Sequence, residues 1–340
     1  MFDWKRVKDE LKQFSKDGIK TLDKLCPLTI DTLHGSMWGL NIRYCSLGAA
    51  LVTHFDEIMQ YSLRRINSIL HMRPPRWKNK DPMIFNSVGL GTYGWKYGED
   101  VIKKAINMGC LIDTAEGYGY GRVEAALGKI FAPRKQAPEN IITKVSRSHM
   151  SPQALVAAGI RSHKRLGFSP YYQLHFPHNC YSDTQIGGSL SYMMNHNIIR
   201  SIGLGNCSVD MIESMQAALE RAGGHRVSTV QIRYNLRDRR IEDTLIPYCQ
   251  ERGIIILAYS PLGQDFSTLQ TPTLDKVAHR LGVGATGVAL AWLLRLKGVL
   301  PIPRTNNVEH LVENVSAADI QLSQKDIKLL DKTYPYSPIS

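Results

Sequence analysis

The sequence predicts an α/β protein, a (β/α)8 TIM barrel with an N-terminal helical extension. Three observations support this fold class. Short apolar runs alternate with helical patterns about eight times after residue 83, as parallel strands with crossover helices do. Four polar residues end successive runs at constant intervals of 31 positions, which is close to the length of one strand–helix unit: Asp113, Lys144, His175 and Asn206. The length of 340 residues suits one large domain with an appendage.

The N-terminal part differs from the rest of the chain. Two amphipathic helical patterns, in residues 2–14 and 47–70, precede a stiff basic linker at residues 73–77. We therefore divide the chain into a helical N-terminal extension of unknown role, residues 1–80, and a barrel, residues 83–340. One hypothesis is that a partner protein docks on the extension. A nucleic-acid or membrane-surface module is a weaker hypothesis, since a solvated basic helix packed on the barrel explains the same charges.

The predicted strands follow one another in order, each an apolar run next to a helical pattern. They are residues 84–90, 110–114, 140–145, 171–176, 201–206, 230–234, 254–260 and 298–303. Helical periodicity is clearest in residues 123–130 and 209–221. An open doubly wound sheet gathers its ligands at one switch point. Here side chains that could take part in catalysis recur at the end of one predicted strand after another, which favours the barrel.

Composition excludes several classes of protein. Hydrophobic residues make up 43% and charged residues 21%, as in globular proteins. The six cysteines lie far apart without a C-x-x-C pair, so neither a zinc site nor a disulfide scaffold is expected, and a reducing, cytoplasmic location is the default. The longest mainly apolar stretch, residues 281–294, is too short for the roughly 20 residues of a transmembrane helix. No signal peptide and no metal-binding histidine motif are recognised.

The net charge of +12 favours anionic partners such as a phosphate-bearing cofactor, and it indicates no specific nucleic acid. A G-x-G-x-x-G pattern at residues 89–94 could cradle phosphate, but four residues intervene between its last glycine and the next helical pattern. We therefore interpret it as a tight turn at the mouth of the first strand.

Several segments together resemble one known family. Asp113 begins Asp-Thr-Ala-Glu-Gly-Tyr, which ends at Tyr118; Lys144 lies in Ile-Thr-Lys-Val, and His175 lies in Leu-His-Phe-Pro. Later segments of the same kind are QIRYN at 231–235, YSPLG at 259–263, and IPRT at 302–305 followed by Glu313-Asn314. From about residue 87 to residue 331 the sequence resembles the aldo-keto reductases. The resemblance implies a barrel enzyme that reduces carbonyl compounds with a nicotinamide dinucleotide.

The chemistry of carbonyl reduction explains these residue types. The nascent alkoxide needs a proton donor, and Tyr118 can be that donor. A free phenol has a pKa near 10, so we expect the ammonium of Lys144 to lower the pKa of Tyr118. Asp113 would keep Lys144 charged, and His175 would orient and polarise the substrate oxygen. Each residue alone is more often a cap or core residue, but the four in family order favour catalysis.

The resemblance also implies a set of cofactor contacts. Asn206 and Gln231 match residues that hold the carboxamide, Tyr259 matches the ring that stacks on the nicotinamide, and Ser260 and Leu262 match the pyrophosphate segment. The adenosine end would be held by Arg304, Thr305, His310, Glu313 and Asn314. A guanidinium at position 304 suits a 2'-phosphate, so NADPH is favoured over NADH. Gly205 replaces the usual serine, which removes one hydroxyl near the carboxamide.

Tyr93, Trp95 and Phe176 are expected aromatic walls of the substrate site, with rim packing as the alternative role. The function predicted is an NADPH-dependent oxidoreductase that reduces small or varied aldehydes or ketones to alcohols. The alternative is a regulatory subunit that binds the cofactor and docks a partner through its N-terminal helices.

Overall fold

The computed structural model describes residues 87–96, 98–132, 140–149, 151–178, 180–264 and 267–336. The predicted N-terminal helices, the basic linker and the boundary at residues 80–83 lie outside these residues, as does the partner-docking hypothesis that depends on them.

The strands of the described chain form one parallel sheet. Within the described residues it has eight strands, each paired with its neighbours in chain order. They are β1 (Leu90–Gly91), β2 (Ile112–Asp113), β3 (Ile141–Val145), β4 (Tyr171–Leu174), β5 (Ser201–Gly205), β6 (Val227–Arg233), β7 (Ile255–Tyr259) and β8 (Val299–Pro301). The sheet closes on itself, because Gly91 bridges Arg304 in parallel and Gly91 N–H donates to Pro303 O at 2.9 Å. The predicted barrel is confirmed.

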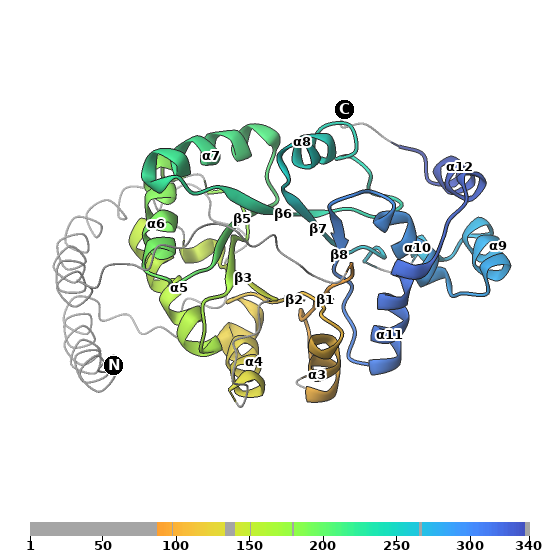
Figure 1. The fold of residues 1–340 in the computed structure, drawn as a ribbon, viewed down its shortest axis with the longest axis horizontal. Helices are drawn as coiled ribbons and strands as arrows, with labels where there is room; N and C mark the ends of the chain where they lie inside the picture. Colours follow the sequence, from red (N-terminus) through yellow and green to blue (C-terminus); the bar gives the residue numbers. More distant parts are fainter. Residues whose placement is uncertain are drawn as a thin grey trace, which may run out of the picture. The chain divides into compact units, whose positions relative to one another are not determined.

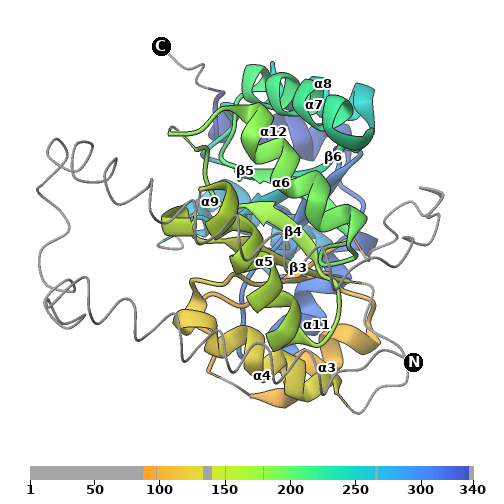
Figure 2. The same cartoon turned by 90° about the vertical axis from the view of Figure 1, so that its left-hand side faces the viewer.

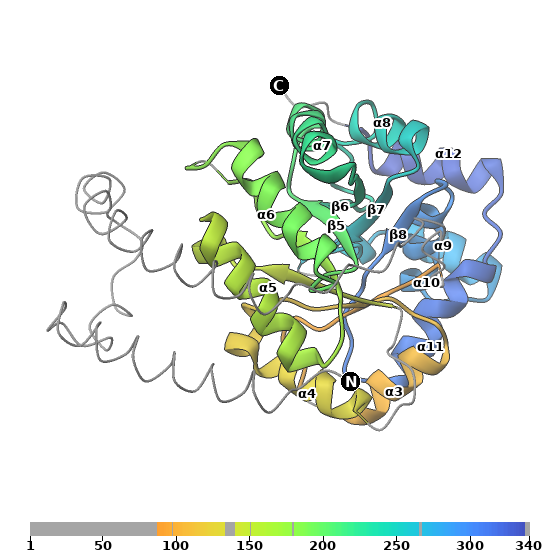
Figure 3. The ribbon, with the colours of Figure 1, turned by 60° about the vertical axis from the view of Figure 1, so that its left-hand side comes forward.

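The helices surround the strands in chain order (Figures 1 and 3). They are α3 (Glu99–Asn107), α4 (Arg122–Phe131), α5 (Pro152–Leu166), α6 (Asp183–Asn195), α7 (Val209–Gly223), α8 (Leu245–Arg252), α9 (Pro272–Leu281), α10 (Ala285–Leu294), α11 (Val308–Ser316) and α12 (Gln324–Thr333). Short 3-10 turns are η2 (Tyr118–Gly121), η3 (Arg147–His149), η4 (Ser267–Leu269) and η5 (Ala317–Asp319). Helices α4, α5 and α6 lie side by side (Figure 2).

In the part of the chain that the structure describes, no single helix is long and apolar enough to span a membrane. Only α9 and α10 taken together reach the required length and apolar character, and the two are bent by 89° relative to each other.

Local sequence explains where helices begin. Ser151, Ser208 and Thr271 each accept a hydrogen bond from the backbone N–H three residues later, at the starts of α5, α7 and α9. Ser182 and Gln185 form a reciprocal capping box at the start of α6. These caps satisfy N–H groups that would otherwise lack partners, so each crossover helix has a defined start after its strand.

The G-x-G-x-x-G segment is a loop, as interpreted from the sequence. Gly94 has φ of +71°, and Trp95 N–H donates to Thr92 O at 3.0 Å, which closes a turn directly after β1. Helix α3 starts only at Glu99. No glycine of this segment therefore opens a helix onto a phosphate.

The core has an inner and an outer part, and this division positions the site. The inner part fills the barrel and consists of Leu111, Ile142, Leu257, Leu300 and Ile302. The outer part lies between strands and helices and includes Leu174, Leu204 and Met215. Since side chains alternate along a strand, Lys144 shares the inward face with Ile142. The polar residues at the strand ends therefore lie directly above the apolar filling of the barrel.

Candidate active site

The barrel brings the predicted polar residues to one rim, at the carboxyl ends of the strands. Asp113 ends β2, Lys144 lies one residue before the end of β3, and His175 follows β4 directly. Asn206 follows β5, and Tyr259 ends β7. In barrels of this type the carboxyl ends of the strands carry the active site.

Asp113 and Lys144 form a buried ion pair at the centre of this rim. The Lys144 Nζ lies 2.9 Å from Asp113 Oδ1 and 3.0 Å from Oδ2, and it also donates to Thr114 O at 2.6 Å. Both side chains are almost completely buried. Burial would lower the pKa of Lys144, but Asp113 and Tyr118 outweigh it and raise that pKa. The lysine is therefore held as an ammonium ion in a site from which water is excluded.

Tyr118 reaches this ammonium from the loop after β2. The Lys144 Nζ donates to the Tyr118 hydroxyl oxygen at 3.4 Å and lies 4.9 Å from the ring centroid. Tyr93 and His175 contact the Tyr118 ring edge to face, with centroids 5.4 and 6.1 Å away. The aromatic ring is thus held on three sides with its hydroxyl at the ion pair.

Lys144 lowers the pKa of Tyr118, as expected, but the net shift of that pKa is upward. Burial raises the pKa of Tyr118 more than Lys144 lowers it, and Asp113 raises it further. The physical reason is that removal from water destabilises the phenolate, while Asp113 cancels part of the field of Lys144. The phenol therefore stays protonated at neutral pH, which is the form a proton donor needs.

His175 completes the group as a neutral imidazole. Burial, assisted by the positive charge of Lys144, lowers its pKa to about 3. Phe176 stacks on the imidazole with the ring centroids 4.8 Å apart and 15° between the planes. A neutral imidazole carries one N–H, so His175 can donate a hydrogen bond to an oxygen without adding a charge to the site.

Two buried glutamates to which the sequence analysis gave no role hold in place the catalytic loop, which is the segment 114–121 between β2 and α4 that contains Tyr118. Glu124 of α4 accepts from Thr143 Oγ1 at 2.6 Å and from Arg165 at 2.7 Å. Since Thr143 precedes Lys144, this carboxylate connects the helix after Tyr118 to the strand of Lys144. A carboxylate among the apolar residues of a predicted helix was the available signal.

Glu116 braces the same loop from its other side. It accepts from Arg161 at 2.7 Å and lies 3.0 Å from His149 Nδ1, and its own N–H donates to Lys144 O. Burial would raise the pKa of Glu116, but Arg161 and His149 together lower it. Glu116 is therefore an anion that fixes the backbone between Asp113 and Tyr118.

Three residues assigned to the nicotinamide end also meet at this rim. The Gln231 amide donates to Asp113 Oδ1 at 2.7 Å. Tyr259 Oη donates to Asn206 Oδ1 at 2.8 Å, and Asn206 Nδ2 donates to the carbonyl of His175 at 3.1 Å. These bonds connect the two amides to Asp113, Tyr118, Lys144 and His175, which we call the four-residue group, through one continuous polar network.

The structure explains why position 205 is glycine. A Cβ atom there would lie 2.6 Å from His175 O and 2.8 Å from Leu174 O. The ends of β4 and β5 approach each other so closely that a side chain would require the backbone beside His175 to move.

The residues assigned to the far end of a dinucleotide lie on two loops. Ser260 has φ of +48° and begins the loop after β7, with Leu262 half-buried in it. Arg304 is exposed, donates to Tyr93 O at 3.3 Å and has no carboxylate partner among the described residues. Thr305 accepts from Asn307 N–H, the N-cap of α11. The remaining three lie on α11, with His310 and Glu313 exposed and Asn314 buried.

The three expected aromatic walls occupy different environments. Tyr93 is 65% exposed and Phe176 is 36% exposed, so both rings are accessible beside the site. Trp95 is only 6% exposed, packs in the core against α3 and donates from its indole to Gly98 O at 3.1 Å. The position of Trp95 corresponds to the rim-packing alternative.

A cavity of about 260 Å³ lies close to His175 but on the outer side of the strands. Its walls include Leu174 and Leu204, which belong to the outer core, together with Met211 and Met215 of α7. Because Lys144 faces the barrel interior, this cavity does not contain the Asp113–Lys144 ion pair, but Phe176, which stacks on His175, is one of its walls.

The arrangement can perform acid catalysis on a bound carbonyl compound. It provides a protonated phenol, a buried ammonium ion fixed by a carboxylate, and a neutral imidazole around one point. The amides and the Tyr259 ring beside it offer hydrogen bonds and a flat surface that suit a nicotinamide. Exposed Arg304 suits a phosphate.

Comparison with known proteins agrees with this chemistry. The sequence profile described as the aldo/keto reductase family matches residues 88–335. The methylglyoxal reductase YeaE of Escherichia coli strain K12 is 29% identical over 265 residues, which cover 73% of this chain and 91% of that protein. An aldo-keto reductase from Klebsiella pneumoniae, solved in complex with NADPH, matches with a TM-score of 0.67 at 28% identity, covering 74% of this chain and 92% of that one. A second structure from the same organism, with NADP and acetate, has a TM-score of 0.65 at 28% identity and covers 77% and 95%.

Proposed function

This chain belongs to the aldo/keto reductase family, and from that premise we propose that it reduces an aldehyde or ketone to the alcohol, with NADPH as hydride donor and Tyr118 as proton donor. One observation carries the proposal: a single buried ammonium, that of Lys144, contacts both the Asp113 carboxylate and the Tyr118 hydroxyl. When bound, NADPH supplies the hydride; the chain supplies the proton and the polar surroundings of the reacting oxygen.

Tyr118 holds the proton that the product alcohol requires. Its raised pKa keeps the phenol protonated at neutral pH. As negative charge develops on the carbonyl oxygen, the phenol transfers its proton and becomes a phenolate. Lys144, 3.4 Å from the phenolic oxygen, stabilises that charge, and Asp113 keeps Lys144 protonated and directed at it. The ion pair therefore assists proton transfer without taking part in it.

His175 orients the substrate. With a pKa of about 3, its imidazole is neutral at pH 7 and donates one N–H to the carbonyl oxygen. A neutral donor polarises the carbonyl without competing with Tyr118 as an acid. The Phe176 ring stacked on the imidazole restricts its rotation.

The cofactor assignment rests on the donor set and on the relatives. Asn206 and Gln231 would hold the carboxamide, and Tyr259 would stack on the nicotinamide. Ser260 and Leu262 would face the pyrophosphate, and Thr305, His310, Glu313 and Asn314 the adenosine. Arg304 would bind the 2'-phosphate, which favours NADPH over NADH. The Klebsiella pneumoniae structures with NADPH and NADP support this choice.

For the substrate we propose small carbonyl compounds. The Escherichia coli relative is named a methylglyoxal reductase, and the exposed rings of Tyr93 and Phe176 offer an apolar surface beside the site. A two-carbon or three-carbon oxoaldehyde, or a simple aromatic aldehyde, would contact these rings while its oxygen meets Tyr118 and His175.

The test is a turnover assay with NADPH and 4-nitrobenzaldehyde. We expect the wild-type chain to oxidise NADPH, and Tyr118→Phe to lower kcat about 100-fold or more, because loss of a general acid commonly has an effect of this size. Tyr120→Phe is the matched control, since Tyr120 is 83% exposed, lies two residues away and should keep full activity. Normal turnover by Tyr118→Phe would exclude Tyr118 as the proton donor.

A further inference from the structure

Arg233 is a cation at the rim of the barrel that has no part in the catalytic and cofactor contacts proposed for the other residues. It is the last residue of β6, two positions after Gln231 and four after Thr229. Thr229 and Gln231 are 1% and 4% exposed and face the barrel interior, and alternation along the strand gives Arg233 the same face. Arg233 is half-buried, one layer above Gln231 and nearer the mouth of the barrel.

Arg233 also lies beside the proposed nicotinamide platform. In the parallel register it pairs with Tyr259, and paired residues of neighbouring strands point to the same face. The guanidinium carbon lies 5.9 Å from the centroid of the Tyr259 ring. The loop that starts at Ser260, with its left-handed residue at φ +48°, therefore begins next to this charge.

The charge of Arg233 has no carboxylate partner in the described part of the chain. Several arginines around the barrel are paired with carboxylates, namely Arg161 with Glu116, Arg165 with Glu124, Arg239 with Glu242, and Arg240 with Asp238, whereas Arg304 shares with Arg233 the lack of such a partner in the described chain. The buried acid below Arg233, Asp113, is bound to Lys144 and Gln231. A half-buried guanidinium with an aromatic ring beside it and no counter-charge is suited to bind an anionic ligand.

We propose that Arg233 binds the pyrophosphate of the dinucleotide, at the phosphate nearer the nicotinamide. This inference rests on the proposed function, and it follows from the position of Arg233 beside Tyr259. Arg304 occupies a different place, since its guanidinium donates to Tyr93 O in the loop after β1. The two arginines therefore bind different phosphates. Both NADPH and NADH carry the pyrophosphate, whereas only NADPH carries the 2'-phosphate.

The test is a calorimetric titration of the full chain with NADPH and with NADH. We expect Arg233→Gln to weaken the binding of both cofactors about ten-fold, the size of one charge-assisted hydrogen bond, and to leave their affinity ratio unchanged. Arg304→Ala should instead change the ratio. Arg233→Lys should recover part of the affinity, because it restores the charge without the bidentate geometry.

Arg226→Gln is the matched control. Arg226 precedes the other end of β6, is exposed, and lies at the opposite end of the barrel, so its replacement removes one positive charge without touching the site. We expect it to bind both cofactors like the wild type. Thermal melting of each variant checks that the fold is intact.

Two outcomes would overturn the inference. The first is wild-type affinity of Arg233→Gln for both cofactors; if the KM for 4-carboxybenzaldehyde then rises but that for 4-nitrobenzaldehyde does not, the anion bound by Arg233 is the substrate. The second is a loss confined to NADPH, which would place the 2'-phosphate there. If the wild-type chain binds neither dinucleotide, the proposed function itself fails.

Discussion

At the scale of single residues, one ammonium sets the charge of the whole site. Lys144 opposes protonation of His175 and stabilises a phenolate at Tyr118, yet burial is the larger influence on both groups. The outcome is one cation, one carboxylate and two neutral groups at neutral pH. A neutral phenol beside a fixed ion pair can give up its proton without leaving an isolated charge in the protein interior, because Lys144 lies next to the phenolate that forms.

This charge state predicts a flat pH profile for reduction. His175 has a pKa of about 3 and Tyr118 a pKa raised above 10. Reduction needs Tyr118 protonated, so kcat should fall only as pH rises toward the raised pKa of Tyr118, and it should be constant between about pH 5 and pH 8. The measurement is kcat across that range at saturating NADPH, with Tyr118→Phe as reference. An inflection near pH 6.5 that disappears in His175→Gln would show that His175 titrates in the working range.

At the scale of elements, the catalytic loop depends on how closely α4 packs against α5. Gly128 of α4 makes this approach possible, since a Cβ atom there would lie 2.0 Å from Arg165 O, a backbone atom that cannot turn aside. The same contact presents Arg165 to Glu124, whose other oxygen binds Thr143 of β3. Gly128 therefore affects the position of Lys144 indirectly, through the ion pair of Arg165 with Glu124 and the hydrogen bond of Thr143 to Glu124.

Two helical glycines should respond to alanine in opposite directions. Replacement of an unhindered helical glycine stabilises a protein by about 0.5–1 kcal/mol, because alanine has the higher helix propensity. We expect that gain for Gly188→Ala in α6, where a Cβ atom would meet nothing within 4 Å. We expect Gly128→Ala to destabilise by about 1–3 kcal/mol through overpacking. Urea denaturation measures both, and stabilisation by Gly128→Ala would show that α4 and α5 separate easily.

The elements also show what the sequence could and could not predict. The positions of Lys144 and His175 at strand ends were predictable, because polar residues recur there at a regular spacing. The net direction in which the pKa of Tyr118 shifts was not predictable, since it depends on how deeply the loop after β2 is buried. Arg233 gave no signal until the register of β6 against β7 placed it beside Tyr259. Contacts between neighbouring strands at such positions are tertiary information that residue spacing does not contain.

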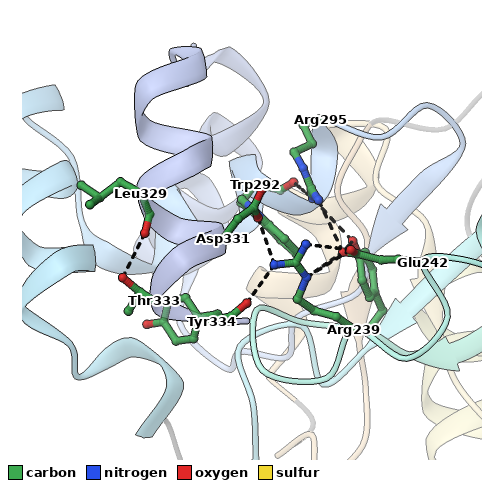
Figure 4. A network of polar contacts seen from close by, with 9 residues as sticks. Arg239, Glu242, Trp292, Arg295, Leu329, Asp331, Thr333 and Tyr334 are labelled. Carbon is green, nitrogen blue, oxygen red and sulfur yellow. Dashed lines mark hydrogen bonds and ion pairs between the residues drawn. The ribbon is translucent and has the colours of Figure 1, made fainter. Parts of the chain in front are cut away.

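At the scale of the whole molecule, a partly buried network of charges joins α12 to the barrel (Figure 4). Arg239, in the segment between β6 and α8, donates to Glu242 at 2.7 Å and to Tyr334 O at 2.8 Å, and it lies 3.0 Å from Asp331 of α12. Trp292 of α10 donates to Asp331 at 3.1 Å. One guanidinium, 8% exposed, thus connects three segments that are far apart in the chain.

Loss of this guanidinium should destabilise the barrel as a unit. Arg239→Ala removes the partner that Glu242 and Asp331 share, but Glu242 keeps Arg295 at 3.4 Å and Asp331 keeps the Trp292 indole. We therefore expect a cost of about 2 kcal/mol, below the roughly 3 kcal/mol or more of a buried pair in which one charge is left alone. The neighbouring Arg240→Ala is the matched control. Arg240 pairs with Asp238 but is 56% exposed, so its loss should cost under about 1 kcal/mol. Urea denaturation at pH 7 measures both free energies of unfolding. Equal effects of the two substitutions would mean that the contacts of Arg239 in Figure 4 contribute little to the stability of the closed barrel, and that α12 is held mainly by its other contacts.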